Sequence, residues 1–259
     1  MILVKIITRF YWIISSQLGI NPKQFFYSIF GLPRYVKNFF NFRKEYQGNI
    51  EFMPCLHDWY EEGGSTKTEY FWQDLYIAQK VYKANPLKHV DVGSRIDGFV
   101  AHIASFREVE IFDIREITSE IPNVIFKRAD LMEPAGDYSN YCDSLSCLHA
   151  LEHFGLGRYG DKINVNGYKL GLRNMANILK KEGIFYLATP IGNPRVAFNA
   201  HRIFDPYELK SIMQEVGLQL KEFAWFGEDK KIIGSVDIDS DFNKLSKLPY
   251  SLGIFTFVK

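Results

Sequence analysis

Three carboxylates stand where short apolar segments end: Asp91, Asp113 and Asp130. Gly93 follows the first of them, and Asp113 comes about 20 residues after that glycine. An apolar strand, a glycine turn, a helix and a second strand ending in an acid form the first half of a nucleotide-binding sheet, in which that acid binds ribose hydroxyls. The turn lacks the Gly-x-Gly-x-x-Gly pattern that cradles a pyrophosphate. The pattern therefore predicts a nucleoside ligand without bridging phosphates.

S-adenosyl-L-methionine is the nucleoside that suits this row of acids. We expect Asp113 to accept hydrogen bonds from both ribose hydroxyls, Asp130 to accept one from the adenine amino group, and Asp91 to lie near the ammonium group. We assign cofactor binding to Asp91, Gly93, Ser94, Arg95, Asp113, Ile114, Asp130, Leu131 and Leu148. Single acids of this kind are often helix caps, so the prediction depends on three of them at successive strand ends.

Three histidines stand on segments that should surround the same site: His149, His153 and His201. A hydroxyl acceptor needs a base whose pKa lies near neutrality, which favours histidine. We predict His149 as the catalytic base, with His153 or His201 orienting the acceptor, although each could instead be a structural residue. The glycine-rich stretch 155–161 predicts a mobile lip. We assign acceptor binding to Glu152, Arg158, Tyr159 and Asp161.

Longer motifs resemble those of the class I S-adenosylmethionine-dependent methyltransferases, over roughly residues 85–226. The segment 143–153 resembles their D-x-x-x-x-x-x-x-L-E-H signature at the fourth strand. The segment 201–217 resembles their H-x-x-F-x-x-x-E-L…G element before the sixth strand. The resemblance implies an α/β fold with a Rossmann-like, doubly wound, mostly parallel seven-stranded sheet, and S-adenosyl-L-methionine as the cofactor.

More narrowly, the segments 89–102 and 148–161 are similar to an uncharacterised family that carries domain of unknown function 268, and the similarity extends from about residue 30 to the C-terminus. Methyltransferases usually have Asp/Glu-x-Gly-x-Gly-x-Gly in the first turn, but here Arg95 replaces the second glycine. This arginine could bind the cofactor's methionine carboxylate, or pair with Asp97 and brace the loop. It also favours an alternative, in which the chain is a catalytically idle methyltransferase-like binding module.

A second alternative comes from His149-Ala-Leu-Glu152-His153, which matches the His-x-x-Glu-His signature of zinc hydrolases. That chemistry needs both histidines on one face of a continuous helix. Here a strand is expected directly before the motif, and Gly155 and Gly157 follow it, which leaves scarcely one helical turn. We therefore predict no metal site.

The elements that position these residues alternate between strand and helix. We expect strands at 89–92, 109–113, 123–128, 143–148, 184–189, 218–226 and 253–258, and helices at 68–84, 99–106, 168–180 and 206–216. Asp205 should cap the last helix, with Pro206 in its first turn, Glu208 completing a capping box and Gly217 at its end. Residues 227–250 are polar and turn-rich. The alternation predicts a parallel sheet whose ligands bind beyond the carboxyl ends of its strands.

We divide the chain into a basic, aromatic N-terminal helical arm and lead-in, residues 1–66, and a methyltransferase-like Rossmann domain, residues 67–259. Residues 1–50 contain seven basic side chains and one acid, whereas the whole chain has a net charge of +1. We expect Asn21-Pro22 and Gly31-Leu-Pro33 to interrupt the arm, and residues 34–67 to be loosely structured.

The arm also has an amphipathic pattern, with apolar residues at helical spacing at Leu3, Ile7, Phe10, Ile14 and Leu18, and with Lys5, Arg9 and Ser16 on another face. Two roles stay open for residues 1–45. They could lie on a membrane surface as an interfacial helix, or pack on their own domain or on a second subunit in a homo-oligomer.

The composition excludes several classes of protein. A hydrophobic content of 47% argues against disorder, and Lys5 and Arg9 break the apolar N-terminus short of a membrane-spanning length. Three cysteines without a Cys-x-x-Cys pair favour a reducing cytoplasm. Nucleic-acid binding is not expected, because the body is acidic and the basic arm is apolar. By its resemblance we expect a cytoplasmic methyltransferase, or one peripheral at the inner face of the membrane, that methylates a small-molecule or glycan acceptor at oxygen in bacterial surface-polysaccharide biosynthesis.

Overall fold

The computed structural model describes residues 7–8, 10–64, 66–134 and 136–259. The chain divides into two compact units, Met1–Ser65 and Thr66–Lys259. Leu3, Lys5 and Arg9 of the expected N-terminal helix lie outside the described residues. Within the described ranges, every helix is too short or too polar to cross a lipid bilayer.

The N-terminal unit is built on one long helix, α2 (Pro22–Glu45), which follows a π-helical turn, η1 (Ile13–Gln17). The side chain of Asn21 accepts hydrogen bonds from two backbone amides of the first turn and caps α2, with proline at the first helical position. The expected interruption at Asn21-Pro22 is confirmed, because residues 18–21 are not helical, but the one expected at Gly31-Leu-Pro33 was wrong. Asn21-Pro22 starts the helix, and α2 continues through Pro33 at the cost of one backbone hydrogen bond.

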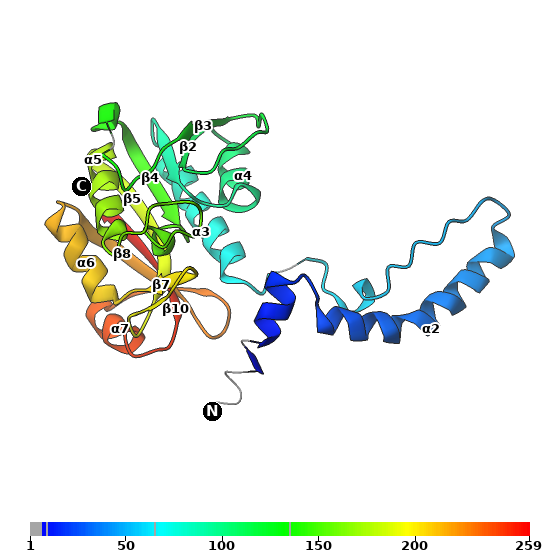
Figure 1. Ribbon diagram of the computed structural model, residues 1–259. Coiled ribbons are helices and arrows are strands. Elements are labelled where there is room, and N and C mark those ends of the chain that lie inside the picture. The colour runs from blue at the N-terminus through cyan, green and yellow to red at the C-terminus, as the bar shows by residue number, and fades with distance from the viewer. Residues whose placement is uncertain (1–6, 9, 65, 135) are drawn as a thin grey trace. The chain divides into compact units, whose positions relative to one another are not determined.

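The segment after α2 runs back along the helix and includes a short 3-10 turn, η2 (Asp58–Tyr60) (Figure 1). Tyr27 stacks on Tyr60 with ring centroids 4.8 Å apart. Gly31 is buried against the backbone of Leu56. A Cβ atom at this position would lie 2.3 Å from the carbonyl oxygen of Leu56, so only glycine fits there. The expectation of a loose lead-in over residues 34–67 is thus wrong up to residue 45, which is helical, while residues 46–57 have no regular structure.

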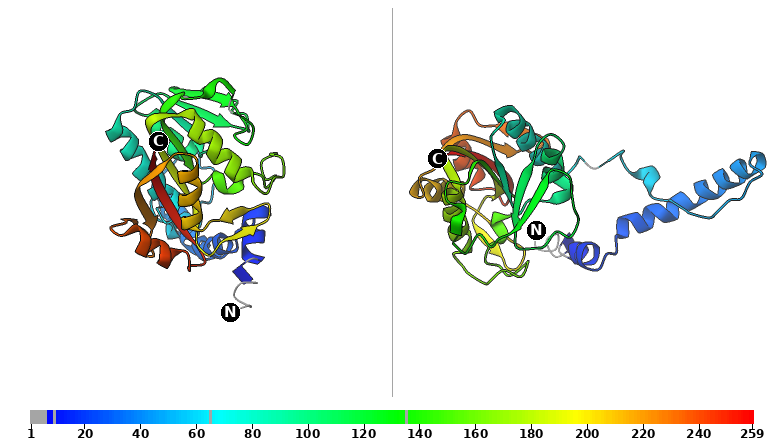
Figure 2. Two further views of the ribbon diagram at one scale, coloured as in Figure 1. Left: turned by 90° about the vertical axis from the view of Figure 1, so that its left-hand side faces the viewer. Right: turned by 90° about the horizontal axis from the view of Figure 1, so that it is seen from above.

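The C-terminal unit is an α/β layered structure around a mixed, mostly parallel sheet (Figures 1 and 2). Within the described residues its eight strands lie in the order β3-β2-β1-β4-β5-β10-β8-β9. They are β1 (His89–Val92), β2 (Val109–Asp113), β3 (Val124–Arg128), β4 (Cys142–Leu148), β5 (Leu179–Ile191), β8 (Gln219–Phe226), β9 (Ile232–Gly234) and β10 (Ser251–Val258). Strands β1 to β5 are mutually parallel, and β10 runs antiparallel between β5 and β8. The predicted Rossmann-like sheet is confirmed, with β9 as one more edge strand than the seven expected.

Helices cover both faces of the sheet. The helices α3 (Glu69–Ala84) and α4 (Ala101–Ala104) pack on one face through apolar side chains that include Ile77, Val81 and Ile103. The helices α5 (Gly167–Ile178), α6 (Pro206–Glu215) and α7 (Ile238–Leu245) cover the other. Short turns η3 (Ile96–Val100), η4 (Gly136–Tyr138) and η5 (Leu151–His153) and a hairpin of β6 (Arg195–Ala197) and β7 (His201–Ile203) complete the unit.

Local signals placed most elements correctly. Strands β1 and β2 coincide with their predicted bounds, and Asp205 caps α6 by accepting the backbone N–H of Tyr207. Glu208 was predicted to complete a capping box, but its carboxylate instead accepts a hydrogen bond from the Tyr168 hydroxyl at 2.8 Å. The segment 227–250 was expected to be turns, but it contains β9 and α7.

Candidate functional site

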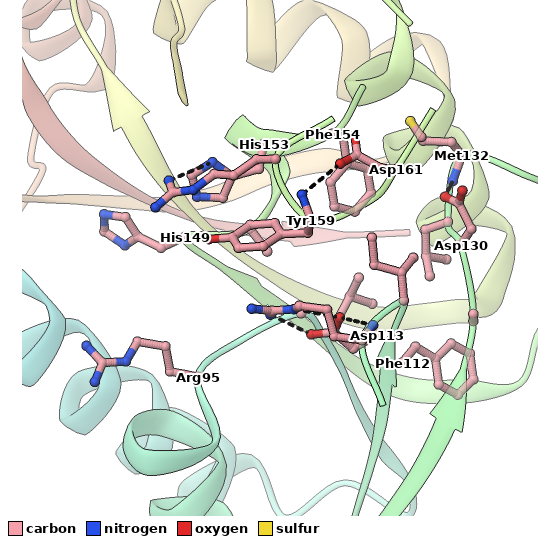
Figure 3. Close-up of a pocket in the computed structure, with 18 of the residues that line it drawn as sticks. Arg95, Phe112, Asp113, Asp130, Met132, His149, His153, Phe154, Tyr159 and Asp161 are labelled. Carbon is pink, nitrogen blue, oxygen red and sulfur yellow. Dashed lines mark hydrogen bonds and ion pairs between the residues drawn. The ribbon is translucent and has the colours of Figure 1, made fainter. Parts of the chain in front are cut away.

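A hollow opens beyond the carboxyl ends of the central parallel strands, where doubly wound sheets bind their ligands (Figure 3). It encloses about 820 Å³, its open mouth included. Eleven of the predicted site residues line it: Gly93, Arg95, Asp113, Ile114, Asp130, Leu131, His149, His153, Arg158, Tyr159 and Asp161. The fold therefore brings the glycine turn, two of the three strand-end acids and the predicted lip together.

The turn after β1 presents bare backbone to the hollow. Gly93 has a φ of +69°, and a Cβ atom there would lie 3.0 Å from the Cβ of Ala150. Both the backbone angle and the space favour glycine. A side chain at this position would fill part of the cradle, so the turn fits a ligand that approaches the main chain closely.

Asp91 lies beneath this turn and does not line the hollow. Its carboxylate is fully buried and accepts hydrogen bonds from the amide of Ser94 (3.0 Å), the hydroxyl of Ser94 (2.7 Å) and the hydroxyl of Ser146 (2.5 Å). Burial raises the pKa of Asp91 to about 6. Ser94 in turn accepts the backbone N–H of Leu148 at 3.2 Å. These three predicted cofactor residues hold the turn to β4, so the ammonium contact expected of Asp91 is not supported.

The other two acids lie at the rim of the hollow. Asp113 is bound by Arg115, with Nε 3.1 Å from Oδ1 and Nη2 2.8 Å from Oδ2. Asp130 accepts the backbone N–H of Met132 at 2.9 Å. Apolar side chains line the hollow on the same side: Phe112, Ile114, Leu131 and Met132. A wall of this kind beside two carboxylates suits a purine ring attached to a ribose.

Arg95 takes the second of its two predicted roles. It lines the hollow, but Nε and Nη2 donate to the carboxylate of Asp97 at 3.0 and 2.6 Å, and the guanidinium lies 5.5 Å from the centre of the Tyr70 ring. The hydrogen bond to Asp97 raises the pKa of Arg95. Arg95 therefore braces the turn at the position where methyltransferases usually have the second glycine of their motif.

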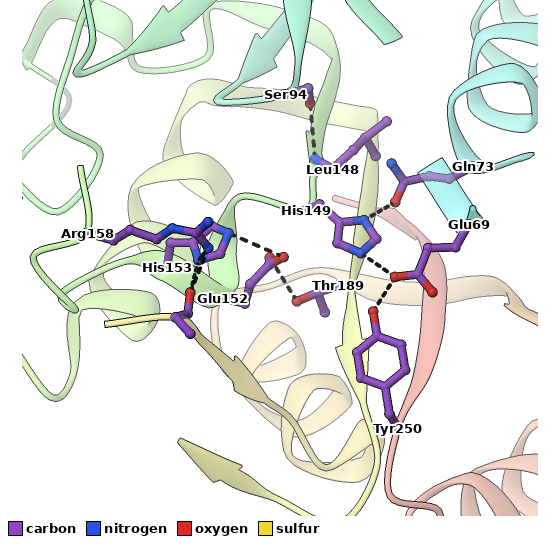
Figure 4. A network of polar contacts seen from close by, with 11 residues as sticks. Glu69, Gln73, Ser94, Leu148, His149, Glu152, His153, Arg158, Thr189 and Tyr250 are labelled. Carbon is purple, nitrogen blue, oxygen red and sulfur yellow. Dashed lines mark hydrogen bonds and ion pairs between the residues drawn. The ribbon is translucent and has the colours of Figure 1, made fainter. Parts of the chain in front are cut away.

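His149 belongs to a buried polar network (Figure 4). Its Nδ1–H donates to the Gln73 side-chain oxygen at 2.7 Å, and its Nε2–H donates to Glu69 at 3.1 Å. Burial by itself lowers the pKa of His149, but the hydrogen bond to Glu69 and the charges of Glu152 and Asp74 outweigh it and raise the pKa. Both ring nitrogens face oxygen acceptors, an arrangement that favours the imidazolium, which has no lone pair. The prediction of His149 as the base is thus not supported.

His153 has the opposite character. Its Nδ1–H donates to the carbonyl oxygen of Ala200 at 2.6 Å, and its Nε2 lies 3.7 Å from a carboxylate oxygen of the buried Glu152. Burial and the nearby charge of Arg158 lower the pKa of His153 to about 4. The ring is therefore neutral at pH 7, and its Nε2 lone pair is not used by the Ala200 bond. Among the three predicted histidines, His153 is the one that both lines the hollow and can accept a proton.

The remaining predicted residues have supporting positions. His201 begins β7 and does not line the hollow. Glu152 lies behind His153, where the Thr189 hydroxyl donates to it at 3.4 Å, and burial raises its pKa. Asp161 accepts the backbone N–H groups of residues 157 and 159 at 3.1 and 3.3 Å, which closes the predicted lip into a compact turn.

The helix required for a His-x-x-Glu-His zinc site is replaced by the single 3-10 turn η5, three residues long. His149 precedes this turn in the left-handed backbone region, with a φ of +52°. Its ring reaches the side chains of α3, while the ring of His153 reaches Ala200. The two rings therefore do not share a helix face, and the hydrolase alternative loses its geometric basis.

Several residues of the site were not predicted from the sequence: Glu69, Tyr70, Gln73, Arg115 and Tyr250. Glu69 and Gln73 are four residues apart on α3, a spacing that places two side chains on one helix face and lets them reach one neighbour. That signal was present, but nothing in the sequence identified His149 as the neighbour. Burial raises the pKa of Tyr70 to about 12, so its hydroxyl is protonated beside the imidazolium.

The fold and the strand-end site together define the class I methyltransferase fold. The structure is similar to the 1,6-didemethyltoxoflavin-N1-methyltransferase of Burkholderia thailandensis, crystallised with 1,6-didemethyltoxoflavin and S-adenosylhomocysteine, at a TM-score of 0.52 and 15% identity over 73% of this chain and 79% of that one. An S-adenosylmethionine-dependent methyltransferase from Clostridium acetobutylicum gives a TM-score of 0.49 and 11% identity over 74% and 92%. The similarity to the Burkholderia enzyme shows the fold alone.

The chain belongs to the family described as Caenorhabditis protein of unknown function, DUF268, whose model matches residues 100–243. The predicted family is confirmed, over a shorter stretch than the one expected from about residue 30 to the C-terminus. No curated protein matches the sequence.

Proposed function

We propose that the protein is an S-adenosyl-L-methionine-dependent methyltransferase that methylates an oxygen atom of a small polar or glycan acceptor. The observation that carries this proposal is the convergence of the Gly93 turn, Asp113 and Asp130 on one hollow with an apolar wall. The similarity in fold to methyltransferases supports it. The bound cofactor would supply an electrophilic methyl group on a sulfonium centre.

The residues of this chain then have distinct tasks. Asp113 would hold the ribose and Asp130 the adenine amino group, while the turn at Gly93 would accommodate the methionine moiety. Neutral His153 is a weak base, because its pKa is about 4, so its Nε2 would accept the hydroxyl proton while the methyl group is transferred, when the acceptor oxygen becomes strongly acidic. Its Nδ1–H stays bonded to Ala200, and Glu152 lies close enough to stabilise the resulting imidazolium. Arg158 and Tyr159, both at the hollow, would bind a polar or anionic part of the acceptor.

The glycan acceptor and a role in bacterial surface-polysaccharide biosynthesis are the finer part of the proposal. They are supported by the polar lip, whose Arg158 donates to the Ala200 carbonyl oxygen at 3.0 Å and has its guanidinium 5.1 Å from the ring centre of Tyr159. Rings and guanidinium groups at a pocket mouth suit hydroxylated or carboxylated sugars. We place the enzyme in the cytoplasm, because Cys142 and Cys147 are buried free thiols and Cys55 is an exposed one.

Two ion pairs at the hollow favour the idle-module alternative. Arg95 and Asp97 close the turn with a two-point ion pair, and Arg115 binds the acid assigned to the ribose. A module of this kind would have the fold without affinity for the cofactor. Binding therefore separates the two functions.

The test is calorimetric titration with S-adenosyl-L-methionine and its demethylated product, S-adenosyl-L-homocysteine. We expect binding to the unmodified protein, and a loss of affinity of about tenfold or more in Asp113→Ala, because hydrogen bonds to a charged group contribute about 1.5–3 kcal/mol. Asp229→Ala is the matched control, since Asp229 is an exposed acid that does not line the hollow. Undetectable binding to the unmodified protein would favour the idle module, and unchanged affinity in Asp113→Ala would remove the ribose assignment.

A further inference from the structure

The long helix α2 of the N-terminal unit carries an exposed apolar stripe. Its side chains are each 43–66% exposed: Phe25, Phe26, Ile29, Phe30, Leu32, Val36 and Phe40. Most of these residues recur three or four positions apart, so they lie along one side of the helix. Over residues 25–40 the stripe is about 22 Å long. Surface helices of globular proteins normally turn such a face inward, and an exposed apolar patch of this size marks an interaction surface.

The opposite side of α2 is the one that its own unit covers. The buried Gly31 faces the backbone of Leu56 there, and Phe39 stacks on Phe52 at 4.7 Å. The guanidinium of Arg34 lies 4.2 Å from the ring centre of Trp59. These contacts fix the rotation of the helix, so the apolar stripe is held away from the segment that packs on α2.

The charge around the stripe has one sign. Between residues 10 and 44 the sequence has five basic side chains and no acid: Lys23, Arg34, Lys37, Arg43 and Lys44. Lys23 lies three residues before Phe26, and Lys37 lies three residues before Phe40, a spacing that makes each pair neighbours on the helix surface. The Lys23 ammonium lies 5.4 Å from the ring centre of Tyr27. Long basic side chains can place their stems along an apolar surface while their charges reach phosphate groups.

We propose that α2 docks on an anionic lipid surface, lying in the plane of the interface with its apolar stripe among the acyl chains and its basic residues at the headgroups. The complementary charges of the basic side chains of α2 and of anionic headgroups support a lipid surface as the partner. A second copy of the chain is the less suitable partner, because pairing two stripes would bring five basic residues of one helix against five of the other, with Glu45 at the end of α2 as the one acid of each helix. The proposal is independent of the chemistry in the hollow.

The experiment is co-sedimentation of the full-length protein with vesicles of phosphatidylcholine containing phosphatidylserine, compared with vesicles of phosphatidylcholine alone. We expect binding to the anionic vesicles that weakens with added salt. The double variant Phe26→Ser/Phe30→Ser should lower the partition coefficient about tenfold or more. Leu87→Ser/Val236→Ser removes two apolar side chains that are 90% and 102% exposed outside the stripe, and should bind like the unmodified protein.

A second pair of variants tests the charge. Lys37→Gln/Lys44→Gln should reduce binding to anionic vesicles several-fold, whereas Lys181→Gln/Lys221→Gln, which changes two exposed lysines of the other unit, should not. Phe26→Leu/Phe30→Leu keeps the stripe apolar and should retain binding, which separates lipid contact from damage to the helix.

Three results would overturn the proposal. The first is no binding of the unmodified protein to anionic vesicles. The second is a dimer in light scattering that Phe26→Ser/Phe30→Ser converts to monomer, which would assign the stripe to a second copy. The third is a lower unfolding temperature of the C-terminal unit in that variant, which would assign the stripe to packing within the chain.

Discussion

Arg115 holds both carboxylate oxygens of Asp113, and its guanidinium lies 4.3 Å from the ring centre of Tyr159 (Figure 3). The hydrogen bond to Asp113 raises the pKa of Arg115. The acid that we assign to the ribose thus has a competing partner two residues away, and the same arginine links the end of β2 to the lip. Ligand binding and the Arg115–Asp113 pair must therefore be coupled.

This coupling predicts in which direction a substitution of Arg115 changes the affinity for the ligand. Arg115→Ala removes the competitor and should tighten the binding of S-adenosyl-L-homocysteine about 1.4- to fivefold, because a partly exposed ion pair is worth about 0.2–1 kcal/mol. Isothermal titration of the variant against the unmodified protein measures the change. Arg173→Ala, which changes an exposed arginine on α5 away from the hollow, should leave the affinity unchanged. Weaker binding in Arg115→Ala would mean that Arg115 contacts the ligand itself.

The positions of the acids at the strand ends were predictable from the sequence, because the strand pattern and the parallel topology determine at which edge of the sheet each of these residues lies. Asp113 ends the buried strand β2, Asp130 comes two residues after the partly exposed edge strand β3, and the carboxyl ends of parallel strands meet at one edge of a sheet. Asp91 emerges at the same edge but faces inward. The difference depends on Ser94 and Ser146, whose hydroxyls reach its carboxylate, and the register that brings Ser146 beside Asp91 is a long-range feature.

The elements that were missed fall into two groups. Helix α7 had a local signal, because Asp237 caps it and Ile238, Phe242 and Leu245 lie at helical spacing, but the polar residues around them outweighed it. The role of His149 had no local signal. Its charge depends on Glu69, 80 residues earlier in the chain, which reaches it only when α3 packs beside β4.

The buried imidazolium predicts a pH dependence of stability. The folded pKa of His149 lies above the value of about 6.5 in an unfolded chain. Its stabilisation is therefore complete below pH 6.5 and is lost as the pH rises through the raised value. His149→Asn tolerates the positive φ of this position and should cost about 2 kcal/mol at pH 6, with a smaller loss above the raised pKa. Urea unfolding across this pH range gives the free energies.

Glu69→Gln is the matched variant for this prediction. It keeps an oxygen that can accept the Nε2–H of His149 but removes the charge that raises the pKa, so it should also flatten the pH dependence. His102→Asn, on α4, replaces a histidine outside the network and should retain the dependence of the unmodified protein. If His149→Asn and the unmodified protein lost stability in parallel from pH 6 to 9, the ionised form would have no part in folding.

The lip should depend on Gly155 for its shape. The residue has a φ of +75°, and a Cβ atom there would lie 2.0 Å from the carbonyl oxygen of Asn164. Gly155→Ala should cost about 2–3 kcal/mol of unfolding free energy, since backbone must move as well as adopt a left-handed angle. Gly160 has a φ of +89°, but no heavy atom lies within 4 Å of the position that a Cβ atom would take. Gly160→Ala should therefore cost only about 1 kcal/mol of unfolding free energy. Thermal unfolding compares the two, and equal losses would mean that the contact at Asn164 has no effect.

The proton-accepting role of His153 gives the sharpest test of the chemistry. His153→Gln should leave the affinity for S-adenosyl-L-homocysteine within about twofold, because we place its ring at the acceptor, while methyl transfer to an acceptor found in a screen of polar metabolites and sugars should fall about 10²–10⁴-fold. The decrease should be in kcat with KM little changed, as for a group that acts in the transition state. His201→Gln is the control, since that histidine does not line the hollow. If His149→Gln abolished transfer and His153→Gln did not, His149 would be the base, and one of its two nitrogens would have to accept and not donate in the contacts with Gln73 and Glu69 that Figure 4 shows.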